Sequence, residues 1–142
     1  MNRGTNSPIG GFSPQRMVVH AAALGGGAGV DGTIPSNGQL ESTLGRYPKG
    51  ENFASALKYN AATGVYYVLL TEPVKHILFV SGMVVDSGGA PTGALNVTPI
   101  SVTPASKRID INIHTPAGVL TDLGTSDMLV LRCEIADTGA IG

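Results

Sequence analysis

Apolar and polar residues alternate with a period of two in the second half of the chain, and this pattern predicts β-strands. Three isoleucines alternate with polar residues between positions 107 and 114: Ile109, Ile111 and Ile113 against Arg108, Asp110, Asn112 and His114. Residues 128–136 repeat the pattern, with Leu129, Leu131, Cys133 and Ile135 on one face and Arg132 and Glu134 on the other. Because successive side chains of a strand point to opposite faces, each apolar set is expected to face a core.

A β-hairpin is expected between residues 53 and 70. Residues 53–59 alternate loosely, and residues 65–70 are rich in the β-branched and aromatic residues that strands favour. Between them, residues 60–64 supply a turn in which Gly64 is free to take a positive φ. Tyr66 and Tyr67 are neighbours and therefore lie on opposite faces, so one is expected in the core and the other as a contact residue.

Two further strands are expected, at residues 76–85 and 95–102. The first is apolar on both faces, which suits a strand buried on both sides or one at a subunit interface, and Gly82 is expected to mark a bulge. The second contains Pro99, which has no N–H to donate, so it is expected to be an edge strand, a bulged strand or two short pieces. About six or seven strands and no helix are expected in all.

Residues 1–50 differ from the rest because glycine, asparagine, serine and proline are frequent and no amphipathic helix can be drawn. An apolar run at 17–23 lies between two such stretches. We expect an extended arm or long loops that become ordered against another surface, with a flexible tail of no role as the alternative. The sequence thus predicts an all-β protein, an antiparallel β-sandwich or barrel at 51–142 with a long extended N-terminal arm at 1–50.

Composition favours association over life as a dilute monomer and argues against nucleic-acid binding. Charged residues make up 13% of the chain and the net charge is −1, against about 25% charged residues in soluble proteins generally. A weakly charged surface repels its neighbours poorly, and it lacks the basic face that binds phosphates. The N-terminus lacks the apolar segment of a secretory signal, and no apolar run is long enough to span a membrane, so synthesis in a cytoplasm is expected.

The sequence contains no recognisable constellation of catalytic or metal-binding residues. His20, His76 and His114 lack the spacing of a zinc site, and Cys133, the only cysteine, sits in an apolar stretch that predicts an inert, buried thiol. Asp122 and Asp127 flank a loop in which they could contribute to a calcium site, but a turn-forming, strand-capping role is favoured. We therefore expect a protein that is not an enzyme and that has no cofactor and no metal.

Three segments resemble a group of small virion proteins of tailed bacteriophages. Residues 60–70 are similar to their TGTGxYxVxL segment, the strand at 108–114 is followed by Pro116-Ala117-Gly118 and Thr121-Asp122, and residues 125–131 form a polar loop followed by a strand. The resemblance covers residues 53–138 and carries no site motif, so no functional residue can be transferred by it.

The resemblance implies a capsid decoration, or cement, protein. Such a protein would lie on the capsid exterior, bind the major capsid protein and associate with itself as a homotrimer or another homo-oligomer, without binding nucleic acid or membrane directly. The expected protein contacts are in the arm and at its end: Arg3, Phe12, Met17, Val18, Val19 and Tyr47. The alternative is a tail or fibre component of a phage, or a module that binds a host glycan.

Overall fold

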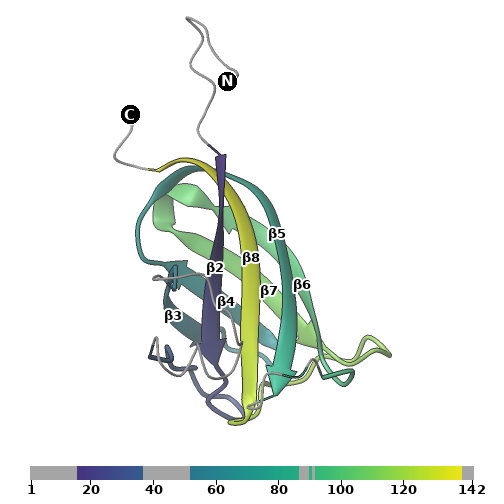
Figure 1. Cartoon of the computed structure of the whole chain (residues 1–142). Coiled ribbons are helices and arrows are strands. Elements are labelled where there is room, and N and C mark those ends of the chain that lie inside the picture. Colours follow the sequence, from purple (N-terminus) through teal and green to yellow (C-terminus); the bar gives the residue numbers. More distant parts are fainter. Residues whose placement is uncertain (1–15, 37–51, 87–89, 91, 139–142) are drawn as a thin grey trace, which may run out of the picture.

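A computed structural model describes residues 16–36, 52–86, 90 and 92–138. These residues form seven strands and one short 3-10 helix. The strands are arranged in two antiparallel sheets that pack face to face (Figure 1). The fold is therefore an all-β sandwich, which confirms the predicted fold class.

The smaller sheet has three strands, in the order β2-β8-β5. Strand β2 spans Arg16–Leu24, β5 spans Val74–Asp86 and β8 spans Asp127–Thr138. The central strand β8 pairs with β2 along one side and with β5 along the other. The outer sides of β2 and β5 are therefore the two edges of this sheet.

The larger sheet has four strands, in the order β3-β4-β7-β6. Strand β3 spans Ala54–Tyr59, β4 spans Val65–Leu70, β6 spans Asn96–Thr103 and β7 spans Arg108–His114. The 3-10 helix Pro104–Ser106 links β6 to β7. In this sheet β3 and β6 are the edges, and β6 lies beside β5 of the other sheet (Figure 1).

The core lies between the sheets and uses the alternating residues that the sequence predicts. The side chains of Ile109, Ile111 and Ile113 on β7 have no exposed area, and the same holds for the apolar set of β8: Leu129, Leu131, Cys133 and Ile135. Each such buried aliphatic side chain stabilises the fold by about 1.5–3 kcal/mol relative to an exposed one. The full burial of Cys133 confirms the prediction of a buried thiol.

The predicted hairpin is formed by β3 and β4. Asn60 N–H donates to the Val65 carbonyl across the turn (2.8 Å), and Gly64 has a φ of 74°. Tyr66 is fully buried, whereas Tyr67 is half-buried on the outer face. The positive φ of Gly64 and the placement of the two tyrosines on opposite faces are both as predicted.

Residues 16–36 were expected in an extended arm, and the structure differs on this point. Strand β2 pairs with β8 over its whole length, and Val19, Ala21 and Ala23 contribute to the core between the sheets. The rest of the expected arm, residues 1–15 and 37–50, lies outside the described residues.

Candidate functional site

An apolar groove runs along one side of the sandwich, where the edge strands β5 and β6 lie next to each other. It has a volume of about 310 Å³, and its lining comes from residues 77–80 of β5 and 99–102 of β6. We call this surface the seam. Four large apolar side chains of the seam are substantially exposed: Leu78 (44%), Phe79 (58%), Ile100 (56%) and Val102 (39%). A cluster of exposed apolar side chains is typical of a protein-binding surface.

Each strand of the seam carries a β-bulge, and each bulge presents an aliphatic side chain. In β5 the register with β8 shifts between Ile77 and Phe79, which makes Leu78 the extra residue. In β6 the register with β7 shifts between Pro99 and Ser101, which makes Ile100 the extra residue. Bulges usually protect a sheet edge by disrupting its regular pairing. Here they also place two apolar side chains where a partner can reach them.

The strand predictions for this region are confirmed in part and wrong in part. The edge position and bulge of the Pro99 strand are as predicted. Strand β5 is not buried on both faces, because Phe79 and Met83 on its outer face are 58% and 45% exposed. The alternative, an interface strand, stays a prediction. The bulge of β5 lies at Leu78 and not at Gly82. A Cβ on Gly82 would come within 2.7 Å of Leu131 Cδ2, so Gly82 instead allows β5 to approach the core closely.

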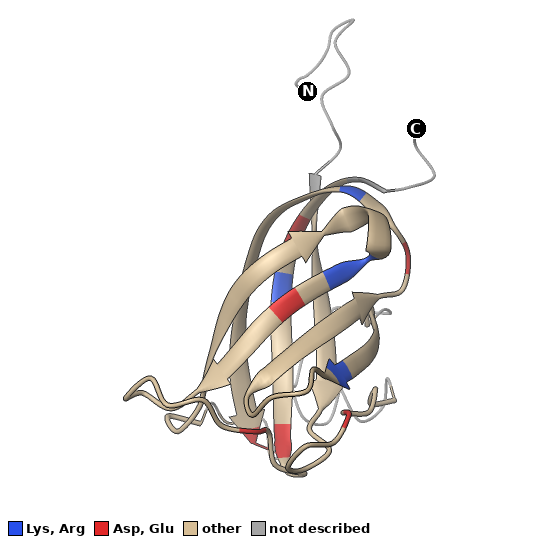
Figure 2. Cartoon of the chain, turned by 180° about the vertical axis from the view of Figure 1, so that it is seen from behind, with Lys and Arg blue, Asp and Glu red and all other residues tan. Residues whose placement is uncertain are grey.

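The seam is almost without charge. Between Lys75 and Lys107 the sequence contains one charged residue, Asp86 at the end of β5. Figure 2 shows the same distribution on the ribbon, where blue and red are sparse and β6 is tan throughout. A partner would therefore contact this surface mainly through apolar side chains and main-chain groups, and little through charged groups.

On the opposite side of the sandwich, where β2 and β3 form the edges, the protein itself covers β2 from His20 to Leu24. Leu24 N–H and C=O both pair with Thr33 (2.8 and 2.9 Å), and the Asn52 side chain binds Ala22 N–H (2.8 Å) and C=O (2.7 Å). Phe53 N–H donates to the His20 carbonyl (2.8 Å).

The neighbouring edge, that of β3, is covered in the same way. Gly32 N–H donates to the Leu57 carbonyl (2.9 Å) and Asp31 accepts from Tyr59 N–H (2.8 Å). The Tyr59 N–H, followed by Lys58, lowers the pKa of Asp31. Edge groups that are satisfied in this way cannot pair with another chain.

A second hollow, of about 240 Å³, lies on the outer face of the three-stranded sheet. It is lined by residues of all three strands: His20, Ser81, Gly82, Met83, Val130 and Arg132. Burial, and then the charge of Arg132, lowers the pKa of His20. Met83 is 45% exposed, so the apolar surface continues from the seam along β5 onto this face.

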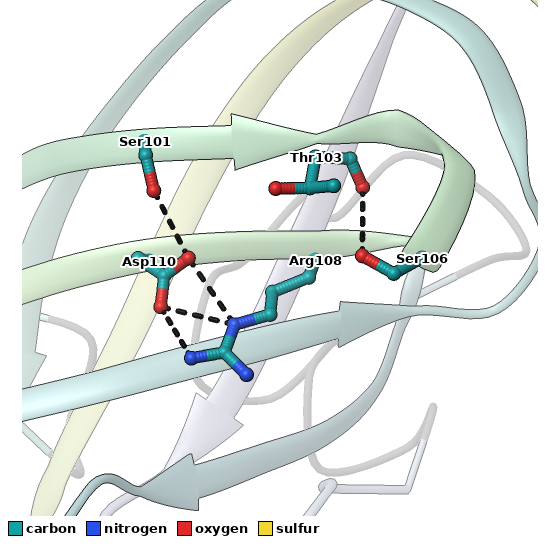
Figure 3. Close-up of polar contacts among 5 residues, drawn as sticks. All are labelled: Ser101, Thr103, Ser106, Arg108 and Asp110. Atoms are coloured by element: carbon teal, nitrogen blue, oxygen red, sulfur yellow. Dashed lines mark hydrogen bonds and ion pairs between the residues drawn. The ribbon is translucent and has the colours of Figure 1, made fainter.

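The outer face of the four-stranded sheet is polar and internally paired. Arg108 Nη2 lies 2.7 Å from Asp110 Oδ1, and the Ser101 hydroxyl donates to Asp110 Oδ2 (3.1 Å), as Figure 3 shows. Arg108, followed by Ser101, lowers the pKa of Asp110. The Arg108 guanidinium also lies 3.8 Å from the centre of the Tyr67 ring, so one face of this ring is already covered. This face therefore offers no open aromatic platform at Tyr67.

The two loop carboxylates act as backbone acceptors, which confirms the predicted turn-forming role. Asp122 accepts from Gly64 N–H (2.7 Å) and Gly29 N–H (2.9 Å), and Asp127 accepts from Gly124 N–H (2.8 Å). Asp122 thus joins three loops at one end of the sandwich. Sequence reasoning placed Asp122 in a turn but could not find its distant partners.

Two buried groups have pKa values above their ordinary range. Burial raises the pKa of Tyr66 to about 12 and that of the Cys133 thiol to about 11. The Tyr66 hydroxyl also accepts from Leu123 N–H (2.9 Å). Neither group is placed to react, because both side chains are fully buried.

We expect the raised pKa of Tyr66 to make stability fall between pH 10 and pH 12. The neutral phenol is favoured in the folded state, so its contribution is complete below the unfolded pKa of 10.0 and is lost as pH rises towards the folded value of about 12. This loss reaches about 2–3 kcal/mol. Urea unfolding at pH 10 and pH 12 measures this loss in two chains. Both carry Cys133→Ala, which removes the other buried group with a raised pKa, and one also carries Tyr66→Phe. The prediction fails if both chains lose the same stability over this pH range.

The predicted contact residues fall into three groups. Arg3, Phe12 and Tyr47 lie outside the described residues. Met17 (46% exposed) and Val18 (43% exposed) are accessible near the start of β2, whereas Val19 (9% exposed) packs into the core. None of the three described residues lies in the seam, which sequence analysis indicated only in part, as the interface alternative for residues 76–85. The uncharged stretch after Lys75 was the available signal.

No family model, curated protein or solved structure matches the chain. Within the described residues, no group of three or more His, Cys, Asp or Glu side chains could hold a metal ion. The described part of the chain also includes no helix with the length and apolar character needed to cross a bilayer.

Proposed function

We propose that this protein is a non-enzymatic structural protein that acts by binding other protein surfaces through the seam. The observation that carries the proposal is the exposure of four large apolar side chains along two strands that form the edges of their sheets. Burial of apolar area stabilises a complex by about 25 cal/mol per Å². The opposite edges are satisfied internally from His20 to Leu24 of β2 and at Leu57 and Tyr59 of β3, so the seam is the favoured surface for a partner.

The specific form of the proposal is a capsid decoration protein that binds the major capsid protein on the exterior of a phage particle. It draws on the resemblance of residues 53–138 and on the low charge of the chain. A shell presents many symmetric copies of each binding surface, so a modest affinity per copy is sufficient when the decorating protein is itself an oligomer.

Binding to purified capsids encoded by the same genome tests this function. We expect the wild-type chain to co-sediment with capsids and to saturate at a fixed number of copies per particle. Replacing the two bulge residues, with Leu78→Ser and Ile100→Ser together, is expected to weaken this binding by about tenfold or more, because central apolar contacts dominate binding energy.

The matched control is Val119→Ser. Val119 is 62% exposed and apolar, but it lies in the loop between β7 and β8 and outside the seam. This variant is expected to bind as the wild type does. Loss of binding in both variants, or in neither, would contradict a role for the seam. Absence of any binding by the wild-type chain would reject the decoration function.

A further inference from the structure

The hollow on the outer face of the three-stranded sheet is crossed by one row of polar side chains. Arg132 of β8 is in register with His20 of β2 on one side and with Ser81 of β5 on the other. Leu131 and Cys133 face the core, so Arg132 and its two cross-strand partners share the outer face. Such neighbours have Cβ atoms about 5 Å apart. A guanidinium, an imidazole and a hydroxyl therefore lie side by side in the hollow.

The rows on either side of this polar row contribute exposed apolar side chains. On one side, Val18 (43% exposed) and Phe79 (58% exposed) are both in register with Glu134. On the other side, Met83 (45% exposed) is in register with Val130. Phe79 also lines the seam, so the seam and the hollow form one continuous surface.

Arg132 has no anionic partner within the described residues. No ion pair among them includes Arg132, and Glu134, two residues further along the same face of β8, forms none with it. Burial, and then the charge of Arg132, lowers the pKa of His20. A lowered pKa keeps the imidazole neutral at pH 7, so the positive charge of the hollow comes from Arg132.

A protein that docks over this surface would take Arg132 out of water. Burying an unpaired guanidinium is costly, whereas a carboxylate forms short, charge-assisted hydrogen bonds that match its planar fork. Arginine is also enriched at the centres of protein interfaces, where surrounding contacts exclude water. The hollow, of about 240 Å³, is smaller than most small-molecule sites, which measure about 300–1,000 Å³. Its size therefore favours a single side chain of another protein over a free ligand.

We propose that the hollow receives an aspartate or glutamate side chain of the protein that binds the seam, with the carboxylate held by Arg132 and Ser81 beside His20. The inference rests on the proposed function and adds what the partner presents, an acidic side chain flanked by apolar ones. The seam supplies apolar contact area, and Arg132 supplies the charge that fixes where the partner lies.

Capsid binding by the full chain, with the charge of the hollow removed, tests this inference. We expect Arg132→Gln to weaken binding by about tenfold or more, and the binding that remains to respond less to added salt than wild-type binding does. Arg132 is exposed, so the variant is expected to keep the wild-type unfolding midpoint in urea.

The matched control is Lys75→Gln. It removes one exposed positive charge of β5 outside the seam and the hollow, and it is expected to bind as the wild type does. Wild-type binding by Arg132→Gln overturns the inference. An equal loss in both variants overturns it as well, because net charge would then explain the effect.

A carbodiimide cross-link identifies the group that the partner places in the hollow. The reagent activates a carboxylate, which then forms an amide with a nearby lysine amine. In capsid-bound Arg132→Lys, we expect mass spectra to show residue 132 joined to an aspartate or glutamate of the capsid protein. The wild-type chain is the control, because its guanidinium forms no such amide. Absence of a product at residue 132 in the bound variant overturns the acidic side chain as the occupant.

Sodium propionate, a carboxylate with a short apolar tail, separates the site from the function on which the inference rests. We expect it to shift the NMR signals of the His20 ring and the Met83 methyl group until they saturate. Neither Arg132→Gln with propionate nor the wild-type chain with propionamide, the neutral analogue, is expected to show this.

The capsid and propionate results together distinguish the possible failures. A chain that ignores capsids but saturates with propionate keeps the carboxylate site and rejects the decoration function. A chain that saturates with propionate while Arg132→Gln binds capsids normally has a site for a free carboxylate, which overturns the partner's side chain as occupant. A chain that binds neither rejects both the function and the inference.

Discussion

Gly64→Ala is expected to lower the free energy of unfolding by about 2–5 kcal/mol. Gly64 has a φ of 74°, where residues other than glycine are strained, and an added Cβ would lie 2.6 Å from Ile113 O and 2.8 Å from Thr121 N. Both are backbone atoms held by hydrogen bonds, since Thr121 N–H donates to Ile113 C=O. Urea unfolding followed by circular dichroism measures the change.

Gly118→Ala is the matched control for this prediction. Gly118 also has a positive φ, of 87°, but an added Cβ would meet nothing within 4 Å. Only the backbone cost of about 1–2 kcal/mol then applies. If the two variants lose equal stability, the close approach of Gly64 to the β7 backbone does not contribute to the fold.

Ile111→Ala is expected to lower the free energy of unfolding by about 2–5 kcal/mol. Ile111 is the central isoleucine of β7, it has no exposed area, and it lies in register with buried Tyr66 of β4. Removing its side chain leaves a cavity between two sheets that can relax only in part. Chemical unfolding of the purified variant measures the loss.

The matched control is the same isoleucine-to-alanine change at an exposed position of the seam, where the removed side chain is not buried. Ile100 lies on β6 and is 56% exposed, so Ile100→Ala is expected to change the stability of one chain by no more than about 0.5 kcal/mol. A large loss in this variant would mean that the bulge residue supports the fold and does not simply face a partner.

The strands that could be predicted are those whose buried and exposed residues differ clearly in character. In β7 and β8 large aliphatic residues alternate with polar ones, so periodicity identifies both the strand and its buried face. Strand β2 has no such contrast, because Ala21, Ala22 and Ala23 are all small and all buried. Its place beside β8 depends on pairing between residues more than one hundred positions apart, which local pattern does not encode.

The seam could be predicted only in part, for a related reason. An apolar run at 76–85 indicates either burial on both sides or an interface, and local sequence does not decide between them. The choice depends on what covers the outer face of β5, and within the described residues Phe79 and Met83 on that face are left exposed. The positions of Leu78 and Ile100 as extra residues follow from registers with β8 and β7, which two-residue periodicity alone cannot place.

The blocked edges of β2 and β3 set a limit on the stoichiometry of any assembly that grows through strand pairing. A sandwich with two open sides could add copies without end and form a fibre. Here Asn52, Thr33 and Asp31 occupy main-chain groups at Ala22 and Leu24 of β2 and at Tyr59 of β3, so within the described residues the β5 and β6 side is the more accessible to a neighbour. Strand pairing about a two-fold axis through that side alone would end at two chains, so the covered edges disfavour growth into a fibre.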